Sequence, residues 1–145
     1  MLNFVKFNYR LQIINSVENR IKGGTCMNNK INENELNKII GNLLYLSGIM
    51  PNLKGYTYIK EAIVMVYNDQ DLLGMLAKIV YPEIGKRHNI SSKTVEMRMK
   101  AAIKKAWEKF DGNEFYKQVG AEWRGSKEPT NSEYIFLAVE YLNNL

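Results

Sequence analysis

The chain has 145 residues, of which 46% are apolar and 24% charged, the size and composition of one globular domain with one core. No stretch approaches the roughly 18 consecutive apolar residues of a membrane span, and the first residues lack the pattern of a secretory signal peptide. The chain has one cysteine, Cys26, and one histidine, His88, which excludes an internal disulfide framework and a His/Cys zinc site. We therefore expect a cytoplasmic protein that uses no metal and no cofactor.

The net charge of +5 is concentrated in residues 86–109. Eight basic residues against two acidic ones give this segment a charge of +6 and leave −1 for the rest of the chain. A concentrated basic patch is typical of a protein that binds a polyanion. The alternative is a solvated, lysine-rich helix face, which charge alone does not distinguish from a binding site.

The first 26 residues differ from the rest. Residues 5–13 alternate apolar and polar side chains, a strand pattern, but no later segment offers a partner strand, and a single strand is not stable. Residues 22–25 (KGGT) can be encoded by a purine-rich sequence of the kind that positions a bacterial ribosome, just upstream of Met27. The hypothesis is that translation starts at Met27, so that residues 1–26 are a leader or disordered segment and residues 27–145 form the domain. The N-terminal mass of the native protein tests this start site.

Helical spacing begins near residue 32. We expect a first helix with Asn34 as its N-cap and Gly48 as its end. A second helix is predicted from about Lys54 to Asp69, with Tyr56 on its buried face. The other apolar residues that define these two helices are Leu36, Ile39, Ile40, Leu43, Leu44, Ile59, Ile63 and Val66.

Two more helices are predicted before residue 90. Asp71 is placed to cap a third helix, whose apolar residues are Leu72, Leu73, Met75, Leu76 and Ile79. Pro82 stands in the first turn of a short fourth helix, at about residues 81–88, where its missing N–H costs nothing. His88 ends that helix, where a cation is favourable and a DNA phosphate could be contacted.

The C-terminal part of the chain is also predicted to be helical. Residues 89–91 form a tight turn, and Ser91 or Ser92 caps a long helix that ends near Lys109. A short helix at about residues 113–119 and a loop precede the last helix, which Thr130 and Glu133 open as a capping box. The predicted fold is all-α, a compact bundle of about six helices that contains a helix–turn–helix.

The long helix has two different faces on a helical wheel of about 100° per residue. Val95, Met99, Ala102 and Ala106 lie on one side and form a core stripe, and Lys93, Met97, Lys100 and Lys104 lie opposite, with Glu96 at the edge. A cationic face after a short helix and a tight turn is typical of a recognition helix in the DNA major groove. Met97 is informative, because a solvated face has no need of an apolar group between lysines. The alternative is that Met97 packs on a neighbouring helix and the lysines are solvated.

We therefore predict a DNA-binding site on and around this helix, with Met97 against a thymine methyl and Lys100 donating to guanine. Lys127 is included because it lies with Trp123 and Arg124 in a loop that could approach the DNA backbone near the minor groove. The predicted DNA-binding residues are Arg87, Ser91, Ser92, Lys93, Thr94, Glu96, Met97, Lys100, Lys104 and Lys127.

Several segments resemble one known family. They are residues 55–63 (GYTYIKEAI), 65–69 (MVYND), 72–74 (LLG), 81–84 (YPEI), 106–107 (AW) and 129–133 (PTNSE). From about Leu44 to Leu142 the chain resembles the DNA-binding effector domain of the master response regulator of sporulation initiation. The resemblance implies a six-helix bundle with a helix–turn–helix that binds a short DNA box, activating or repressing promoters. In that family a phosphorylated receiver domain precedes the effector domain and promotes dimerisation on DNA.

The chain departs from this family in two respects. It carries no receiver domain, so no phosphoacceptor aspartate can be assigned. The family's recognition helix has a glutamate that matches Glu96, with arginines at the positions of Thr94, Met97 and Lys100. Arginine pairs with guanine through two donors and lysine through one, so the family's sequence specificity is not carried over.

The expected function is that of a sequence-specific regulator that binds double-stranded DNA, with a recognition helix at about residues 91–109. It is expected to be no enzyme, to bind no small-molecule substrate and no membrane, and to act in the nucleoid. RNA polymerase or a sigma factor is a further expected partner, and a homodimer on DNA is expected. The alternative is a receiver-less interaction module that binds or antagonises a full-length regulator or RNA polymerase. Sequence preference together with salt dependence distinguishes the two.

Overall fold

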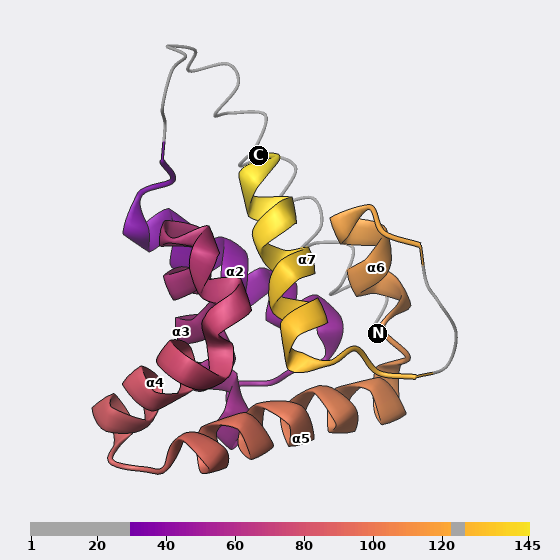
Figure 1. The fold of residues 1–145 in the computed structure, drawn as a ribbon. Coiled ribbons are helices and arrows are strands. Elements are labelled where there is room, and N and C mark those ends of the chain that lie inside the picture. Colours follow the sequence, from indigo (N-terminus) through magenta and orange to yellow (C-terminus); the bar gives the residue numbers. More distant parts are fainter. Residues whose placement is uncertain (1–29, 123–126) are drawn as a thin grey trace.

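The computed structural model describes residues 30–122 and 127–145, and all regular secondary structure in these ranges is helical (Figure 1). The helices are α2 (Glu33–Ser47), α3 (Lys54–Asn68), α4 (Tyr81–His88), α5 (Ser92–Phe110), α6 (Asn113–Val119) and α7 (Asn131–Asn143). Two short elements, η1 (Gln70–Met75) and η2 (Leu76–Val80), join α3 to α4. The prediction of an all-α fold is confirmed. The proposed leader and its strand pattern lie outside the described residues.

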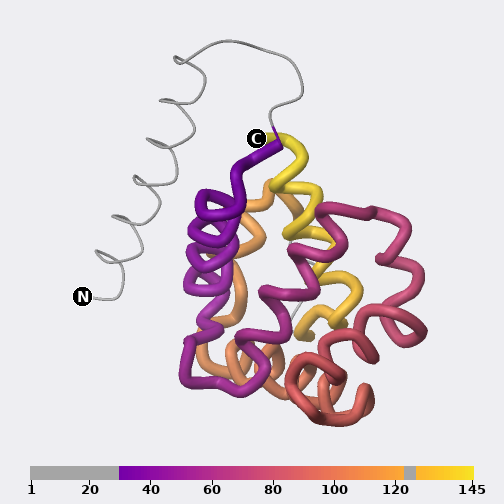
Figure 2. Tube along the Cα trace, turned by 90° about the vertical axis from the view of Figure 1, so that its left-hand side faces the viewer, coloured from indigo at the N-terminus to yellow at the C-terminus, as the bar shows by residue number. Residues whose placement is uncertain are grey.

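The arrangement places one long helix across the end of a group of upright helices. α2, α3 and α7 stand side by side, and α5 crosses one end of this group (Figures 1 and 2). α3 is central, because it packs against α2, α4, α5 and α7. α6 fills the side between α2 and α7. The helix pair α4–α5 therefore lies at the edge of the molecule, supported by α3 and by one end of α7.

One continuous apolar core holds the bundle together, and every α-helix contributes to it. Its largest fully buried side chains include Tyr134, Phe115, Ile40, Leu43, Ile59, Ile84, Met99 and Ile103. The ring of Phe115 stacks on that of Tyr134, with centroids 4.6 Å apart, and the Trp107 ring meets both edge-on. This aromatic cluster fixes the C-terminal end of α5 to α6 and α7.

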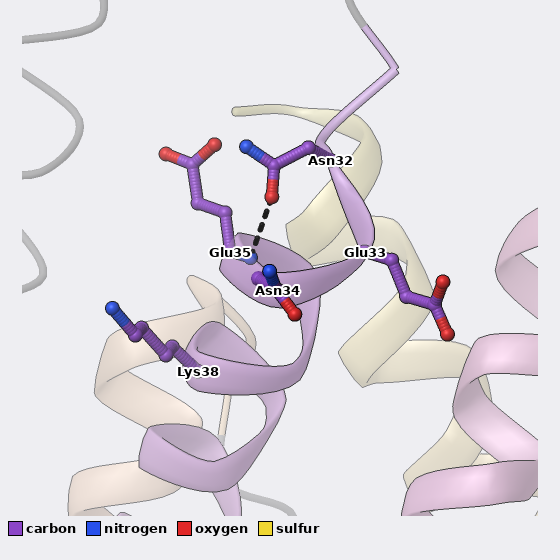
Figure 3. A pocket seen from close by; sticks show the side chains of 5 residues that line it. All are labelled: Asn32, Glu33, Asn34, Glu35 and Lys38. Atoms are coloured by element: carbon purple, nitrogen blue, oxygen red, sulfur yellow. Dashed lines mark hydrogen bonds between the residues drawn. The ribbon is translucent and has the colours of Figure 1, made fainter.

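The first helix begins at a different asparagine from the one expected. Asn32, not Asn34, is the N-cap of α2, and its Oδ1 accepts a hydrogen bond from the Glu35 backbone N–H at 2.9 Å (Figure 3). The physical reason is the apolar residue that precedes it. Ile31 and Leu36 are both buried, which is the spacing of a hydrophobic staple on either side of an N-cap at residue 32. Gly48 ends the helix in the left-handed conformation, as predicted.

The predicted third α-helix is wrong in type and in its cap. Asp69 is the cap, since its Oδ1 accepts from the Asp71 N–H, and the chain then forms a 3-10 helix followed by one π-helical turn. A 3-10 turn stacks residues three apart and shifts the helical register. Consequently, of the apolar residues predicted for this segment, only Leu76 is buried, and Met75 and Ile79 are exposed.

The other predicted boundaries agree closely with the structure. α3, α4 and α6 occupy the predicted ranges, and α5 ends one residue beyond Lys109. Thr130 caps α7 by accepting from the Glu133 N–H at 3.1 Å. Tyr56 is half-buried rather than buried, and this partial burial raises its pKa.

Candidate nucleic-acid interface

A tight turn of fixed geometry joins α4 to α5. Asn89 adopts the left-handed conformation (φ 54°, ψ 46°), and the Ile90 N–H donates to the Gly85 carbonyl at 2.9 Å. A Cβ on residue 85 would lie 2.5 Å from the Ile90 carbonyl oxygen, so the turn packs on a position that only glycine can occupy. Because the turn is closed by its own backbone, the direction in which α5 leaves α4 is set locally.

The two faces of α5 are divided as the helical wheel predicts. Its buried residues are Val95, Met99, Ala102, Ile103, Ala106 and Trp107, and its opposite face exposes Lys93, Glu96, Met97, Lys100 and Lys104. Met97 is 60% exposed, the largest value among the exposed large hydrophobic residues of the described chain. This exposure excludes the alternative in which Met97 packs on a neighbouring helix.

The exposed lysines of α5 are available to an external partner. Within residues 30–122 and 127–145, no carboxylate lies in ion-pair range of Lys93, Lys100 or Lys104. Met97 lies between these cations along the helix, and Glu96 adds one exposed carboxylate at the edge of the face. The surface therefore combines unpaired donors, one acceptor and one apolar group, which are the groups that base edges and phosphates require.

The hydroxyl groups at the start of α5 are already engaged with the helix. Ser91 Oγ accepts from the Thr94 N–H at 3.1 Å and lies 2.7 Å from Thr94 Oγ1. One of these two hydroxyls donates to the other, which leaves a single hydroxyl proton for an outside acceptor. Ser92, the first residue of α5, is half-buried. Ser91 is thus the N-cap, and it and Thr94 form one unit rather than two independent contacts.

Two predicted residues lie away from the exposed face of α5. Arg87 of α4 pairs with Glu83 at 3.4 Å, one helical turn earlier, and lines a hollow with residues of α2 and α3. Lys127 lies in the loop before α7, where it lines a second hollow with Glu128 and Glu133. The structure therefore does not bring Arg87 or Lys127 together with the lysines of α5.

Sequence reasoning missed the side-chain contacts that join α3 to the helix pair α4–α5. Arg98 belongs to α5 but donates from Nη1 to the Tyr58 hydroxyl of α3, at 3.2 Å. His88 was predicted as a helix-end cation, yet its Nε2 lies 2.9 and 3.0 Å from the two carboxylate oxygens of Glu61. These partners are 40 and 27 residues apart, so no local pattern could have found them.

The described part of the chain holds neither a metal-binding cluster nor a membrane-spanning helix. Residues 30–122 and 127–145 contain no group of three or more His, Cys, Asp or Glu side chains placed to hold a metal ion. In the same residues, no helix has the length and hydrophobicity needed to cross a membrane. A shallow hollow at the start of α2 is lined by Asn32, Glu33, Asn34, Glu35 and Lys38 (Figure 3). The start of α2 lies at the end of the molecule opposite α5 (Figures 1 and 2).

The chain is an all-α bundle in which the short helix α4, a closed turn and the long helix α5, with its exposed cationic face, follow one another. This is the architecture of helix–turn–helix DNA-binding domains. Residues 39–142 match the family described as sporulation initiation factor Spo0A C terminal, and the chain belongs to this family. The family is the DNA-binding effector domain of a sporulation regulator and is not an enzymatic one. The resemblance found in the sequence is thereby confirmed over nearly the same range.

Proposed function

We propose that the chain is a transcription regulator that reads double-stranded DNA by placing the first turns of α5 in the major groove. One observation carries this proposal: Met97 is 60% exposed on a face that also presents Lys93, Lys100 and Lys104 without an ion-pair partner in the described residues. A face that served only solubility would not need the apolar side chain. Membership of a DNA-binding family supports the same function.

The exposed residues divide into two proposed roles. Glu96, Met97 and Lys100 contact base edges: the carboxylate accepts from a cytosine amine, the thioether side chain contacts a thymine methyl, and the ammonium donates to guanine. Lys93 and Lys104 contact phosphates on either side of the groove. The free hydroxyl proton of the Ser91–Thr94 unit and the N–H groups of the first turn of α5 donate to a further phosphate.

Arg87 and Lys127 have a smaller role in this proposal. Arg87 would reach phosphate only by leaving Glu83, an exposed pair of the kind worth at most about 1 kcal/mol. Lys127 would reach the DNA backbone only where the duplex extends beyond α5 toward the start of α7. Neither residue is expected to influence the choice of bases.

Selection of bound duplexes from a random pool tests the proposal. We expect an enriched motif that binds roughly 10³ to 10⁷ times more tightly than random duplex of the same length, with both affinities falling steeply as salt rises. If two copies bind together, as proposed for a homodimer on DNA, the motif should repeat about 10 base pairs apart. Binding without any preferred motif would contradict sequence reading. Binding to RNA polymerase or to a full-length regulator, with no duplex bound, would favour the interaction-module alternative.

A further inference from the structure

The central helix α3 contacts both helices of the helix–turn–helix. Gly55, near its start, lies directly on α5: a Cβ there would come within 2.8 Å of the Ala102 Cβ and would overlap the carbonyl group of Arg98. One turn and two turns further along α3 stand Tyr58 and Glu61. The close approach at Gly55 therefore brings these two polar side chains to the back of the helix pair.

Tyr58 holds α5 from the side opposite to its exposed face. Its side chain is buried, and its hydroxyl accepts a hydrogen bond from Arg98 Nη1 at 3.2 Å. Arg98 directly follows Met97 in the chain, so one of these neighbours points outward and the other toward α3. Rotation of α5 about its own axis would move Met97 and break this hydrogen bond at the same time.

Glu61 holds α4 at its last residue, His88, where the helix meets the turn to α5. Because a carboxylate can only accept, His88 Nε2 donates to it, 2.9 and 3.0 Å from the two oxygens. The ring of His88 also meets the ring of Tyr58 edge-on, with centroids 4.9 Å apart. Tyr58, Glu61, His88 and Arg98 therefore form one connected set of contacts, which we name the α3 brace.

We propose that Tyr58 and Glu61 are positioning residues for DNA binding, which fix the orientation of α5 relative to α4 through Arg98 and His88. This inference rests on the proposed function. Apolar packing is non-directional, whereas a hydrogen bond depends on both distance and angle. Reading bases requires groups held within about 0.5 Å and 10–20° of the productive geometry, and the α3 brace supplies directional contacts at both helices.

The Tyr58→Phe variant tests the brace, because it keeps the ring and its contact with His88 but removes the hydroxyl. We expect the ratio of specific to non-specific DNA affinity to fall about tenfold, the size expected for one hydrogen bond to a charged group. Affinity for random duplex should stay unchanged, since the lysines of α5 are untouched. Tyr67→Phe, the same change at a half-buried site on α3, is the matched control and should keep the wild-type ratio.

A pair of variants at Glu61 gives a second, independent measurement. Glu61→Ala removes both oxygens to which His88 donates and should lower the affinity ratio, whereas Glu61→Gln keeps one acceptor oxygen and should restore most of the ratio. Circular dichroism and melting temperature establish that each variant is folded. A residue with only a structural role would lower the melting temperature and leave the affinity ratio of the folded protein unchanged.

The outcomes separate the brace from the function on which it rests. If the wild type selects a motif and Tyr58→Phe and Glu61→Ala both keep its affinity ratio, the brace is overturned and the proposed function stands. If the wild type shows no sequence preference, the proposed function is overturned and the brace falls with it.

Discussion

Asn131, the first residue of α7, donates from its Nδ2 to the backbone carbonyl of Glu96 in α5, and the two atoms are 3.2 Å apart. The same Nδ2 lies 3.2 Å from the hydroxyl of Tyr81, the first residue of α4. One buried amide group thus ties the last helix of the chain to both helices of the helix–turn–helix. The Asn131 Oδ1 atom finds no hydrogen-bond partner within the described residues.

Replacement of this amide should therefore cost stability. Asn131→Ala removes two hydrogen bonds and leaves the buried Tyr81 hydroxyl without its donor, which should lower the free energy of unfolding by about 1–3 kcal/mol. Urea denaturation followed by circular dichroism measures the change. Asn143→Ala, at the exposed end of the same helix, is the control and should have little effect. Equal stability of both variants would mean that the Asn131 contacts contribute nothing net.

Lys104 should bind phosphate rather than a base, because it lies three turns from the start of α5. Lys104→Ala should weaken binding to all duplexes alike and reduce the slope of log affinity against log salt by about one unit. Titrations of one selected and one random duplex at several salt concentrations provide the measurement. A loss confined to the selected duplex would mean that Lys104 reads a base and that α5 docks in a different register.

Met97→Arg should change the preferred DNA sequence without changing the fold. A guanidinium offers two donors to guanine, so we expect a preference for guanine to appear at one position, worth roughly 1–3 kcal/mol. The melting temperature should stay close to that of the wild type, because residue 97 is 60% exposed. Repeating the selection with the variant reveals the shift. An unchanged motif would assign base reading to Glu96, Lys100 and Thr94 instead.

Tyr134 should make the fold sensitive to alkaline pH. Complete burial is the main reason that its pKa is raised well above the usual value of 10.0. In the unfolded chain this tyrosine loses its proton above about pH 10, while in the folded chain it keeps it, so unfolding releases a proton and stability falls as pH rises. The full stability is present below pH 10.

The Tyr134→Phe variant isolates this contribution. Its free energy of unfolding should be lower at neutral pH by roughly 1 kcal/mol, since the buried Ser47 Oγ, 2.7 Å from the hydroxyl, loses the donor from which it accepts and keeps only its own bond to the Leu43 carbonyl. Above pH 10 its stability should fall less steeply than that of the wild type, by up to about 1.4 kcal/mol per pH unit. Burial also raises the pKa of Tyr56, Tyr81 and Tyr141, so some alkaline decline should remain. Parallel curves for the two proteins would contradict the assignment to Tyr134.

Gly48 cannot accept a side chain without loss of stability. Its φ is 84°, and a Cβ would collide with the ring of Phe110 at the end of α5. Gly48→Ala should cost about 1–2 kcal/mol for the left-handed backbone and about 1–3 kcal/mol for the overlap. Gly74→Ala is the matched control, since a Cβ there would meet no atom within 4 Å. Thermal melting of the two variants should differ clearly, and equal melting temperatures would contradict the packing at Gly48.

Much of the fold could be predicted because its signals are local. Gly48 and Thr130 mark helix ends by their own backbone and side-chain chemistry. Gly48 ends α2 as predicted, and Thr130 caps α7, which is one half of the predicted capping box; within the described residues the Glu133 side chain makes no return bond. The two faces of α5 follow from the helical period alone. The mistaken cap at Asn34 shows the limit of a local signal: two asparagines had similar propensity, and burial of Ile31 decided between them.

The rest of the site depends on contacts that no local pattern contains. The segment 70–80 has helical spacing, but it must join α3 to α4, and the chain meets that constraint with a 3-10 helix and a π-turn. In the sequence, Arg98 looks like one more basic residue of a cationic helix. Only its hydrogen bond to Tyr58 shows that its side chain points toward α3. Residue type was enough to predict that the surface of α5 is cationic. Which of its basic side chains are engaged within the protein, as Arg98 is, depends on the fold.

The exposure of Met97 and Lys100 has a consequence for how such domains diverge. At the positions of Thr94, Met97 and Lys100 the resemblance places arginines. Among residues 30–122 and 127–145, Thr94 is the one of these three whose side chain has a hydrogen-bond partner, Ser91. A substitution at position 97 or 100 therefore disturbs no buried contact. Such a substitution can persist in evolution without a compensating change elsewhere in the protein. The target of such a domain can drift over generations while its scaffold stays the same.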